Sequence, residues 1–256
     1  MRTIRLLSMG WLFHMKMLTR SSFNTFLGIV YPLFFATIAF FMFKAGDDSK
    51  PLLYASLGAA VMGIWGTTST AAGNALSRER WHGTLELLVA APTHFSYVLL
   101  PVTIAMATIG IYSLVATLVW GRILFGIELH VVHPLMFAFS IPATVLTFGA
   151  LGFLFAVCFV RFRAAWALGN MFEYPVWLIC GFLVPLTFFP DWVRPISWVL
   201  APTWGMSAIR ESALGGTPLP DLLLCLGLGT AYVAFAVLVT NRVLYDARAR
   251  GSLSLT

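Results

Sequence analysis

Long apolar stretches dominate this chain, and short polar segments separate them. An α-helix needs about 20 apolar residues to cross a bilayer, because about 30 Å of hydrocarbon is climbed at about 1.5 Å per residue. Six stretches reach that length and predict six transmembrane helices. They are Phe23 to Phe43, Leu52 to Gly73, Tyr97 to Trp120, Pro134 to Val160, Ala165 to Phe188 and Asp221 to Leu244. The pattern predicts an all-α integral membrane protein with its transmembrane domain over residues 23–256.

Composition and charge agree with this fold class and predict an orientation. Hydrophobic residues make up 59% of the 256 residues and charged residues only 10%, against about 25% in soluble domains. Cytoplasmic loops of membrane proteins retain Lys and Arg. If the N-terminus is cytoplasmic, 11 of the 16 Lys and Arg residues lie on that side. Both termini are therefore expected in the cytoplasm, and the net charge of +6 reflects topology rather than binding of nucleic acid.

Residues 1–22 have the pattern of an amphipathic helix. On a helical wheel, Arg2, Arg5 and Lys16 share one arc, and Leu7 and Trp11 lie on the opposite arc. A helix of this kind lies in the plane of the membrane interface, with its basic face toward anionic lipid headgroups. The alternative is an ordinary positive flank of the first transmembrane helix.

The polar loop 74–94 follows the second predicted span and is too charged to lie in hydrocarbon. Gly83 interrupts good helix formers, and Pro92 ends the stretch, which predicts two short helices hinged at Gly83 and Thr84. The charged and apolar side chains suit docking to a soluble partner, whereas a merely solvated connection is the alternative. The residues expected to dock are Arg78, Glu79, Arg80, Gly83, Thr84, Leu85 and Glu86.

The order Glu-Arg-x-x-Gly-Thr-Leu-Glu over residues 79–86, followed by Pro92, resembles the cytoplasmic loop of ABC-2 type permeases. These permeases are membrane subunits of ATP-driven exporters. The resemblance implies that loop 74–94 carries a coupling helix, which docks on a separate ATP-binding cassette ATPase. It also implies a dimer, formed with a second copy or a sister permease, in a bacterial plasma membrane.

The Gly-Thr-Leu-Glu signature over residues 83–86 is similar to that of the drug-resistance and lipo-oligosaccharide export group. This implies export of an amphipathic drug-like or lipid-like compound. The alternative within the family is a polysaccharide or glycolipid exporter. An ion-coupled secondary transporter is the alternative from another class, but it would require several intramembrane ionisable residues and an internal repeat, which the sequence lacks.

No nucleotide or metal site is predicted in this chain. A Walker A loop requires a Lys directly after a Gly, and none of the lysines has that neighbour. ATP and Mg²⁺ are therefore expected on the partner subunit. The cysteines Cys158, Cys180 and Cys225 fall in separate predicted spans without metal-ligand spacing. With no hydrolase signature present, we expect no enzymatic activity of its own.

The resemblance continues between the fifth and sixth predicted spans. ABC-2 permeases show a similar series of Gly, Pro and a late Arg, in which two short re-entrant helices dip back from the outer face. The corresponding residues are Gly181, Pro185, Pro190, Pro202 and Arg210. Cys180 and Ala201 stand where the family often has Ser and Asn. Since repeated prolines forbid a seventh continuous helix, a re-entrant segment is expected over 189–215.

Glu173 lies within the fifth predicted span, about eight residues from its start. At about 1.5 Å per residue, this places it roughly 12 Å along the helix. Intramembrane carboxyl groups usually face the interior of a helix bundle and have a partner there. One hypothesis is that Asn170, Glu173 and Pro175 line the export path and favour cationic or hydrogen-bonding substrates. The alternative is a structural role, in which Glu173 is protonated, bonds to a neighbouring helix or extends toward Arg163.

Overall fold

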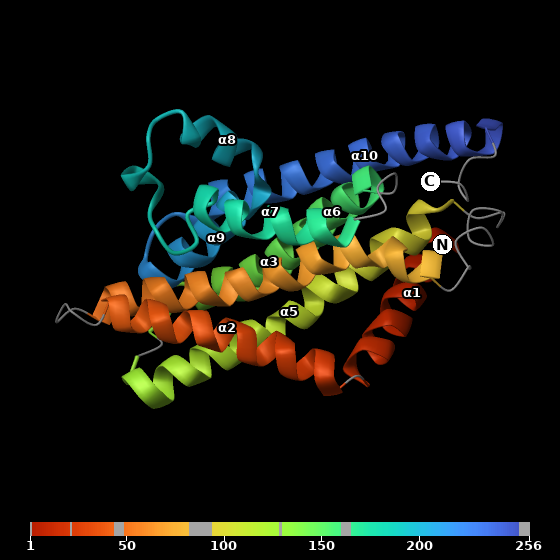
Figure 1. The fold of residues 1–256 in the computed structure, drawn as a ribbon. Coiled ribbons are helices and arrows are strands. Elements are labelled where there is room, and N and C mark those ends of the chain that lie inside the picture. The colour runs from red at the N-terminus through yellow and green to blue at the C-terminus, as the bar shows by residue number, and fades with distance from the viewer. Residues whose placement is uncertain are drawn as a thin grey trace.

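The computed structural model describes residues 2–20, 22–43, 49–81, 94–127, 130–159 and 165–250. All regular structure in these ranges is helical, and Figure 1 shows long helices running side by side. The helices are α1 (Arg2–Thr19), α2 (Ser22–Phe43), α3 (Ser49–Trp81), α5 (Ser96–Phe125), α6 (Pro134–Phe159), α7 (Ala165–Ile179), η1 (Leu186–Phe188), α8 (Val193–Val199), α9 (Ala201–Leu214) and α10 (Pro218–Arg250). The all-α prediction is confirmed.

The predicted spans correspond to α2, α3, α5, α6, α7 and α10. Among the described residues, α5, α6 and the part of α10 up to Arg242 are long and apolar enough to cross a membrane, and an 18-residue stretch of each has a mean hydropathy of 2.1, 2.0 and 2.4, respectively. These helices establish a membrane protein. The count of six spans stays a prediction.

The fifth predicted span is shorter than expected, because α7 ends at Ile179 instead of continuing to Phe188. Its 15 residues cover only about 22 Å at about 1.5 Å per residue. Gly181 has a φ of +70°, a left-handed conformation that glycine adopts readily and other residues avoid. Pro185 follows shortly afterwards and precedes η1. Together these two residues turn the chain out of the helix.

Helix α3 is the central element and packs against α2, α5, α6, α7 and α9. Its middle is apolar around its whole circumference, as expected for a helix without a solvent face. Trp65 is fully buried, and its ring lies 5.8 Å from the ring of Phe148 and 5.9 Å from that of Phe155 on α6. The core of the bundle therefore surrounds α3.

Helix α1 crosses the long helices at one end of the bundle and packs against α5 (Figure 1). Trp11 donates a hydrogen bond from Nε1 to Oγ1 of Thr108 at 3.1 Å. Arg5 and Lys16, on the predicted basic arc, are exposed. A helix is thus present over the predicted segment, while its amphipathic role and its position in a membrane interface stay predictions.

The two ends of the bundle differ in the charged residues that the structure describes, while the predicted orientation stays a prediction. Figure 1 places α1, the end of α3 and the later turns of α10 at one end, and α8 and α9 toward the other. The described basic residues Arg5, Lys16 and Arg242 belong to the first end. Asp191 and Glu211 belong to the second end. The second end also contains Asp221 and the basic residues Arg122, Arg194 and Arg210, so its described charges are mixed in sign.

Candidate functional site

The predicted docking residues continue directly from the central helix. Helix α3 extends to Trp81, so Arg78, Glu79 and Arg80 belong to its last turn and not to a separate short helix. Gly83, Thr84, Leu85 and Glu86 lie outside the described residues, and so does the predicted hinge. The 33 residues of α3 cover about 50 Å at about 1.5 Å per residue. One continuous helix therefore joins the docking motif to the opposite end of the bundle.

Helices α3 and α7 approach each other through small residues. Ser69 on α3 donates a hydrogen bond from Oγ to the carbonyl oxygen of Gly169 on α7. A Cβ atom at Gly169 would lie 2.7 Å from the backbone oxygen of Ser69. One turn further along, a Cβ at Gly66 would lie 2.8 Å from Oε1 of Glu173. The two backbones are thus as close as glycine permits, and the Glu173 carboxyl group lies over Gly66.

The three candidate residues of the export path on α7 differ in burial. Glu173 is 6% exposed and faces α3. Asn170 and Pro175 are exposed, together with Met171 and Tyr174. Glu173 is therefore buried in the bundle, whereas its two proposed neighbours are exposed. Arg163, its suggested partner, lies outside the described residues.

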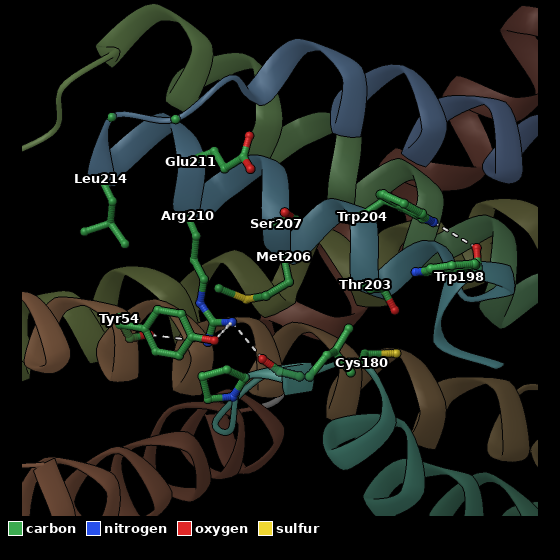
Figure 2. A pocket seen from close by; sticks show the side chains of 15 residues that line it. Tyr54, Cys180, Trp198, Thr203, Trp204, Met206, Ser207, Arg210, Glu211 and Leu214 are labelled. Atoms are coloured by element: carbon green, nitrogen blue, oxygen red, sulfur yellow. Dashed lines mark hydrogen bonds between the residues drawn. The ribbon is translucent and has the colours of Figure 1, made fainter. Parts of the chain in front are cut away.

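Arg210 on α9 joins three parts of the chain that are distant in sequence (Figure 2). Its side chain is 8% exposed. Nη1 donates hydrogen bonds to the Tyr54 hydroxyl and to the Gly181 carbonyl, both at 2.7 Å. Nη2 donates to the carbonyl of Phe182, and Cζ lies 3.4 Å from the centroid of the Tyr54 ring. Arg210 therefore connects α9 to α3 and to the turn that follows α7.

Two of the carbonyl groups that bind Arg210, those of Gly181 and Phe182, belong to the turn that follows α7. Gly58 permits this contact, because a Cβ there would overlap the Phe182 oxygen and lie 2.8 Å from Nη2 of Arg210. Sequence reasoning identified Arg210 and Gly181 but missed Tyr54 and Gly58. Their spacing of four residues, which places them on one face of α3, was the available signal.

A pocket of about 510 Å³ lies beside Arg210, and we name it the α9 pocket. Its wall includes Tyr54, Cys180, Trp198, Met206 and Ser207 (Figure 2). Of the five residues predicted for the re-entrant segment, Gly181, Pro185 and Arg210 line this pocket. Pro202 is buried in the first turn of α9, and Pro190 is exposed before α8.

Side-chain hydrogen bonds fix the break between α8 and α9. The hydroxyl of Tyr232 on α10 accepts a hydrogen bond from the Ala201 N–H at 3.0 Å and donates one to the Val199 carbonyl. Trp204 donates from Nε1 to the carbonyl of Trp198 at 2.8 Å. Two short helices thus occur where the re-entrant segment was predicted. Their depth in a membrane stays a prediction.

Charged groups near the end of α9 influence one another. Burial raises the pKa of the Glu211 carboxyl group, and the neighbouring Asp221 raises it further, whereas the Thr217 N–H lowers it. Within the described part of the chain, no group of three or more His, Cys, Asp or Glu side chains is placed to hold a metal ion. This end of the protein is therefore equipped for binding and positioning through hydrogen bonds.

These features define a helical membrane permease, built around one long helix that ends in a charged motif. The chain belongs to the ABC-2 type transporter family, whose model matches residues 6–214. The match extends from α1 to the end of α9 and includes the α3–α7 contact and Arg210. The predicted family is confirmed: the chain is a membrane permease subunit of an ABC transporter, and such permeases generally pair with an ABC ATPase subunit. No curated protein matches this chain.

Proposed function

We propose that this chain is the permease subunit of a bacterial ABC exporter, which moves an amphipathic drug-like or lipid-like compound out of the cell. A separate subunit would bind and hydrolyse ATP. The continuity of α3 is the observation that carries the proposal. This helix joins Arg78, Glu79 and Arg80 at one end to Tyr54 near the other, without a break.

The packing of α3 supports a route for coupling. A displacement of its charged end by the ATPase would act on α7 through the close contact at Gly169 and Glu173. The same displacement would act on α9 through the hydrogen bond between Tyr54 and Arg210. A closely packed contact without voids transmits such a movement because it has no slack. Helices α7 and α9 would then change position together.

The exposed face of α7 supports assembly into a dimer. Trp166, Met171 and Tyr174 are 55%, 66% and 51% exposed, and Asn170 and Pro175 share this face. We propose that it faces a second permease, either another copy or a sister chain, and that the export path runs between them. In this arrangement both termini and loop 74–94 are cytoplasmic.

The experiment that tests this proposal is purification of the full chain from its host membrane in mild detergent. We expect a Walker A-containing ATPase in equal amount, and we expect the double variant Glu79→Ala, Glu86→Ala to lose it. The control is Arg194→Ala, which removes a charge at the α8 end and should retain the ATPase. An assembly free of ATPase, or a double variant that keeps it, would refute the coupling role of this motif.

Cargo is tested separately with inside-out vesicles that contain the intact complex. We expect ATP-dependent uptake of a fluorescent cationic amphiphile, and no uptake of a water-soluble oligosaccharide. Uptake of the oligosaccharide alone would contradict the proposed cargo class while leaving the permease assignment intact.

A further inference from the structure

The α9 pocket contains polar atoms that the described part of the protein leaves without hydrogen-bond partners. Among the described residues, several buried side-chain nitrogen or oxygen atoms lack such a partner. Two of them, Nε of Arg210 and Oε2 of Glu211, belong to residues that line this pocket. Buried polar atoms are normally paired, so two unpaired atoms among the residues that line one pocket indicate a ligand or water site.

Arg210 keeps an unbalanced positive charge. Its four hydrogen-bond acceptors are three carbonyl groups and one hydroxyl group, all of them neutral. Among the described residues, an ion pair forms between Arg194 and Asp191, and none involves Arg210. Arginine does not lose its proton in proteins, so the buried charge persists. A buried cation without a counter-charge is costly, and an anionic group beside it would offset that cost.

The neutral contacts also fix the orientation of the guanidinium group. Tyr54, Gly181 and Phe182 hold the two terminal nitrogen atoms. The Nε–H remains as an additional donor, and the Ser207 side chain lies on the same wall, one helical turn away. A donor group held in place before binding loses little entropy when a ligand arrives.

The remainder of the pocket suits an apolar chain or ring. Leu186, Trp198, Trp204, Met206 and Leu214 contribute apolar surface to its wall. Its volume of about 510 Å³ falls within the range of about 300–1,000 Å³ that is typical of small-molecule sites. A mostly apolar cavity with one fixed cation is suited to an amphiphile that carries an acidic head.

We propose that the α9 pocket binds an amphiphile with a single acidic group, either a carboxylate or a phosphate, against Arg210. Its apolar part contacts Trp198, Trp204 and Met206. Glu211 points away from Arg210 on the other side of α9 and places a carboxyl group on the same pocket (Figure 2). It therefore disfavours compounds with several acidic groups. This binding goes beyond the proposed export function, because it requires neither ATP nor a coupling subunit.

The test uses the full chain, purified in its native assembly, and dodecyl phosphate as the probe in native mass spectrometry. We expect one bound probe per permease. Dodecyltrimethylammonium, with the same chain and the opposite charge, should bind at least about tenfold more weakly, as expected for loss of a charge-assisted contact. The variant Arg210→Gln should weaken dodecyl phosphate binding by a similar factor.

Two further variants keep the test decisive if Arg210→Gln does not fold. Ser207→Phe fills the pocket without touching the hydrogen bonds of Arg210 and should abolish binding of the probe. Arg194→Gln removes an exposed cation that is already paired at 3.3 Å, and should change binding less than about twofold. No binding to the original protein, equal binding of both probes, or unchanged binding in Ser207→Phe would overturn the proposal.

Two sources share this chemistry, a membrane lipid and a transported acid. Reconstitution in bilayers of phosphatidylcholine, with and without phosphatidylglycerol, distinguishes them. If the lipid headgroup is the natural occupant, phosphatidylglycerol reduces dodecyl phosphate binding. If a transported acid is the natural occupant, phosphatidylglycerol leaves dodecyl phosphate binding unchanged. Both results support the site and assign its source.

Discussion

The α3–α7 contact is directly testable by adding a single methyl group. In Gly169→Ala, the new Cβ would lie 2.7 Å from the backbone oxygen of Ser69 and 3.3 Å from the Cα of Gly73. Both neighbours are backbone atoms of a long helix, and neither can rotate away. Helices α3 and α7 must therefore separate, and the hydrogen bond between Ser69 and Gly169 weakens.

The size of the effect follows from three contributions. Overpacking of a closely packed contact costs about 1–3 kcal/mol. The weakened hydrogen bond costs about 1 kcal/mol, and replacing Gly by Ala within a helix recovers about 1 kcal/mol. The net loss is about 2 kcal/mol in the free energy of unfolding. For a chain of this size that corresponds to a decrease in melting temperature of roughly 4–8 °C.

The assay is the loss of monodisperse protein on heating, measured for detergent-purified variants. Gly227→Ala is the matched control, because Gly227 is an exposed helical position of α10 with no atom within 4 Å of an added Cβ. It should raise the melting temperature slightly. Gly66→Ala should fall between the two, since its Cβ meets only the movable carboxyl group of Glu173 at 2.8 Å. The reasoning is refuted if Gly169→Ala has the same melting temperature as the original protein, or if Gly227→Ala lowers the melting temperature by as much as Gly169→Ala does.

The remaining predictions concern two carboxyl groups. The pKa of Glu211 is raised in the folded protein, so its ionisation lowers the free energy of unfolding as pH rises above the usual carboxyl range. The variant Glu211→Gln cannot ionise there. It should therefore be more stable than the original protein at pH 8 but not at pH 4. Thermal melts at both values check this, and an equal gain at both would contradict it. Glu173→Gln should keep its melting temperature and slow transport of cationic amphiphiles relative to neutral ones. Unchanged transport of both classes would eliminate Glu173 from the export path.

The hydropathy pattern predicted the bounds of several helices closely, and where the observed bounds differ, the difference has a physical cause. The predicted spans Phe23 to Phe43 and Pro134 to Val160 agree with α2 and α6 to within one residue at each end. Helix α7 ends early, because an apolar sequence conceals the left-handed turn at Gly181. Helix α3 continues past its apolar part, because polarity ends a membrane span without ending a helix, and Ala, Leu, Arg and Glu are good helix formers.

The candidate sites, too, were predicted only in part from the sequence. The family resemblance pointed to Arg210, and the structure shows the hydrogen-bond partners that hold its buried side chain. Its partner Tyr54 lies 156 residues earlier in the chain, so no local pattern connects the two. Glu173 is buried in the bundle, and its position within a membrane stays a prediction. The direction in which its side chain faces depends on which neighbouring helix carries a glycine. Gly66 on α3 supplies that space.

The hydrogen bonds of Tyr232 have a consequence for the order in which the protein is completed. Ribosomes synthesise the chain from its N-terminus, so α8 and α9 emerge before α10. Until Tyr232 arrives, the Ala201 N–H and the exposed Val199 carbonyl lack their partner. For the Ala201 N–H, which lies in a buried residue, a missing partner costs about 1–3 kcal/mol. The α8–α9 segment and the wall of the α9 pocket therefore reach their final form only after the last helix is inserted. A biogenesis intermediate stalled before α10 would contain every residue that lines the pocket. Its α8–α9 segment, however, would lack the hydrogen bonds to Tyr232.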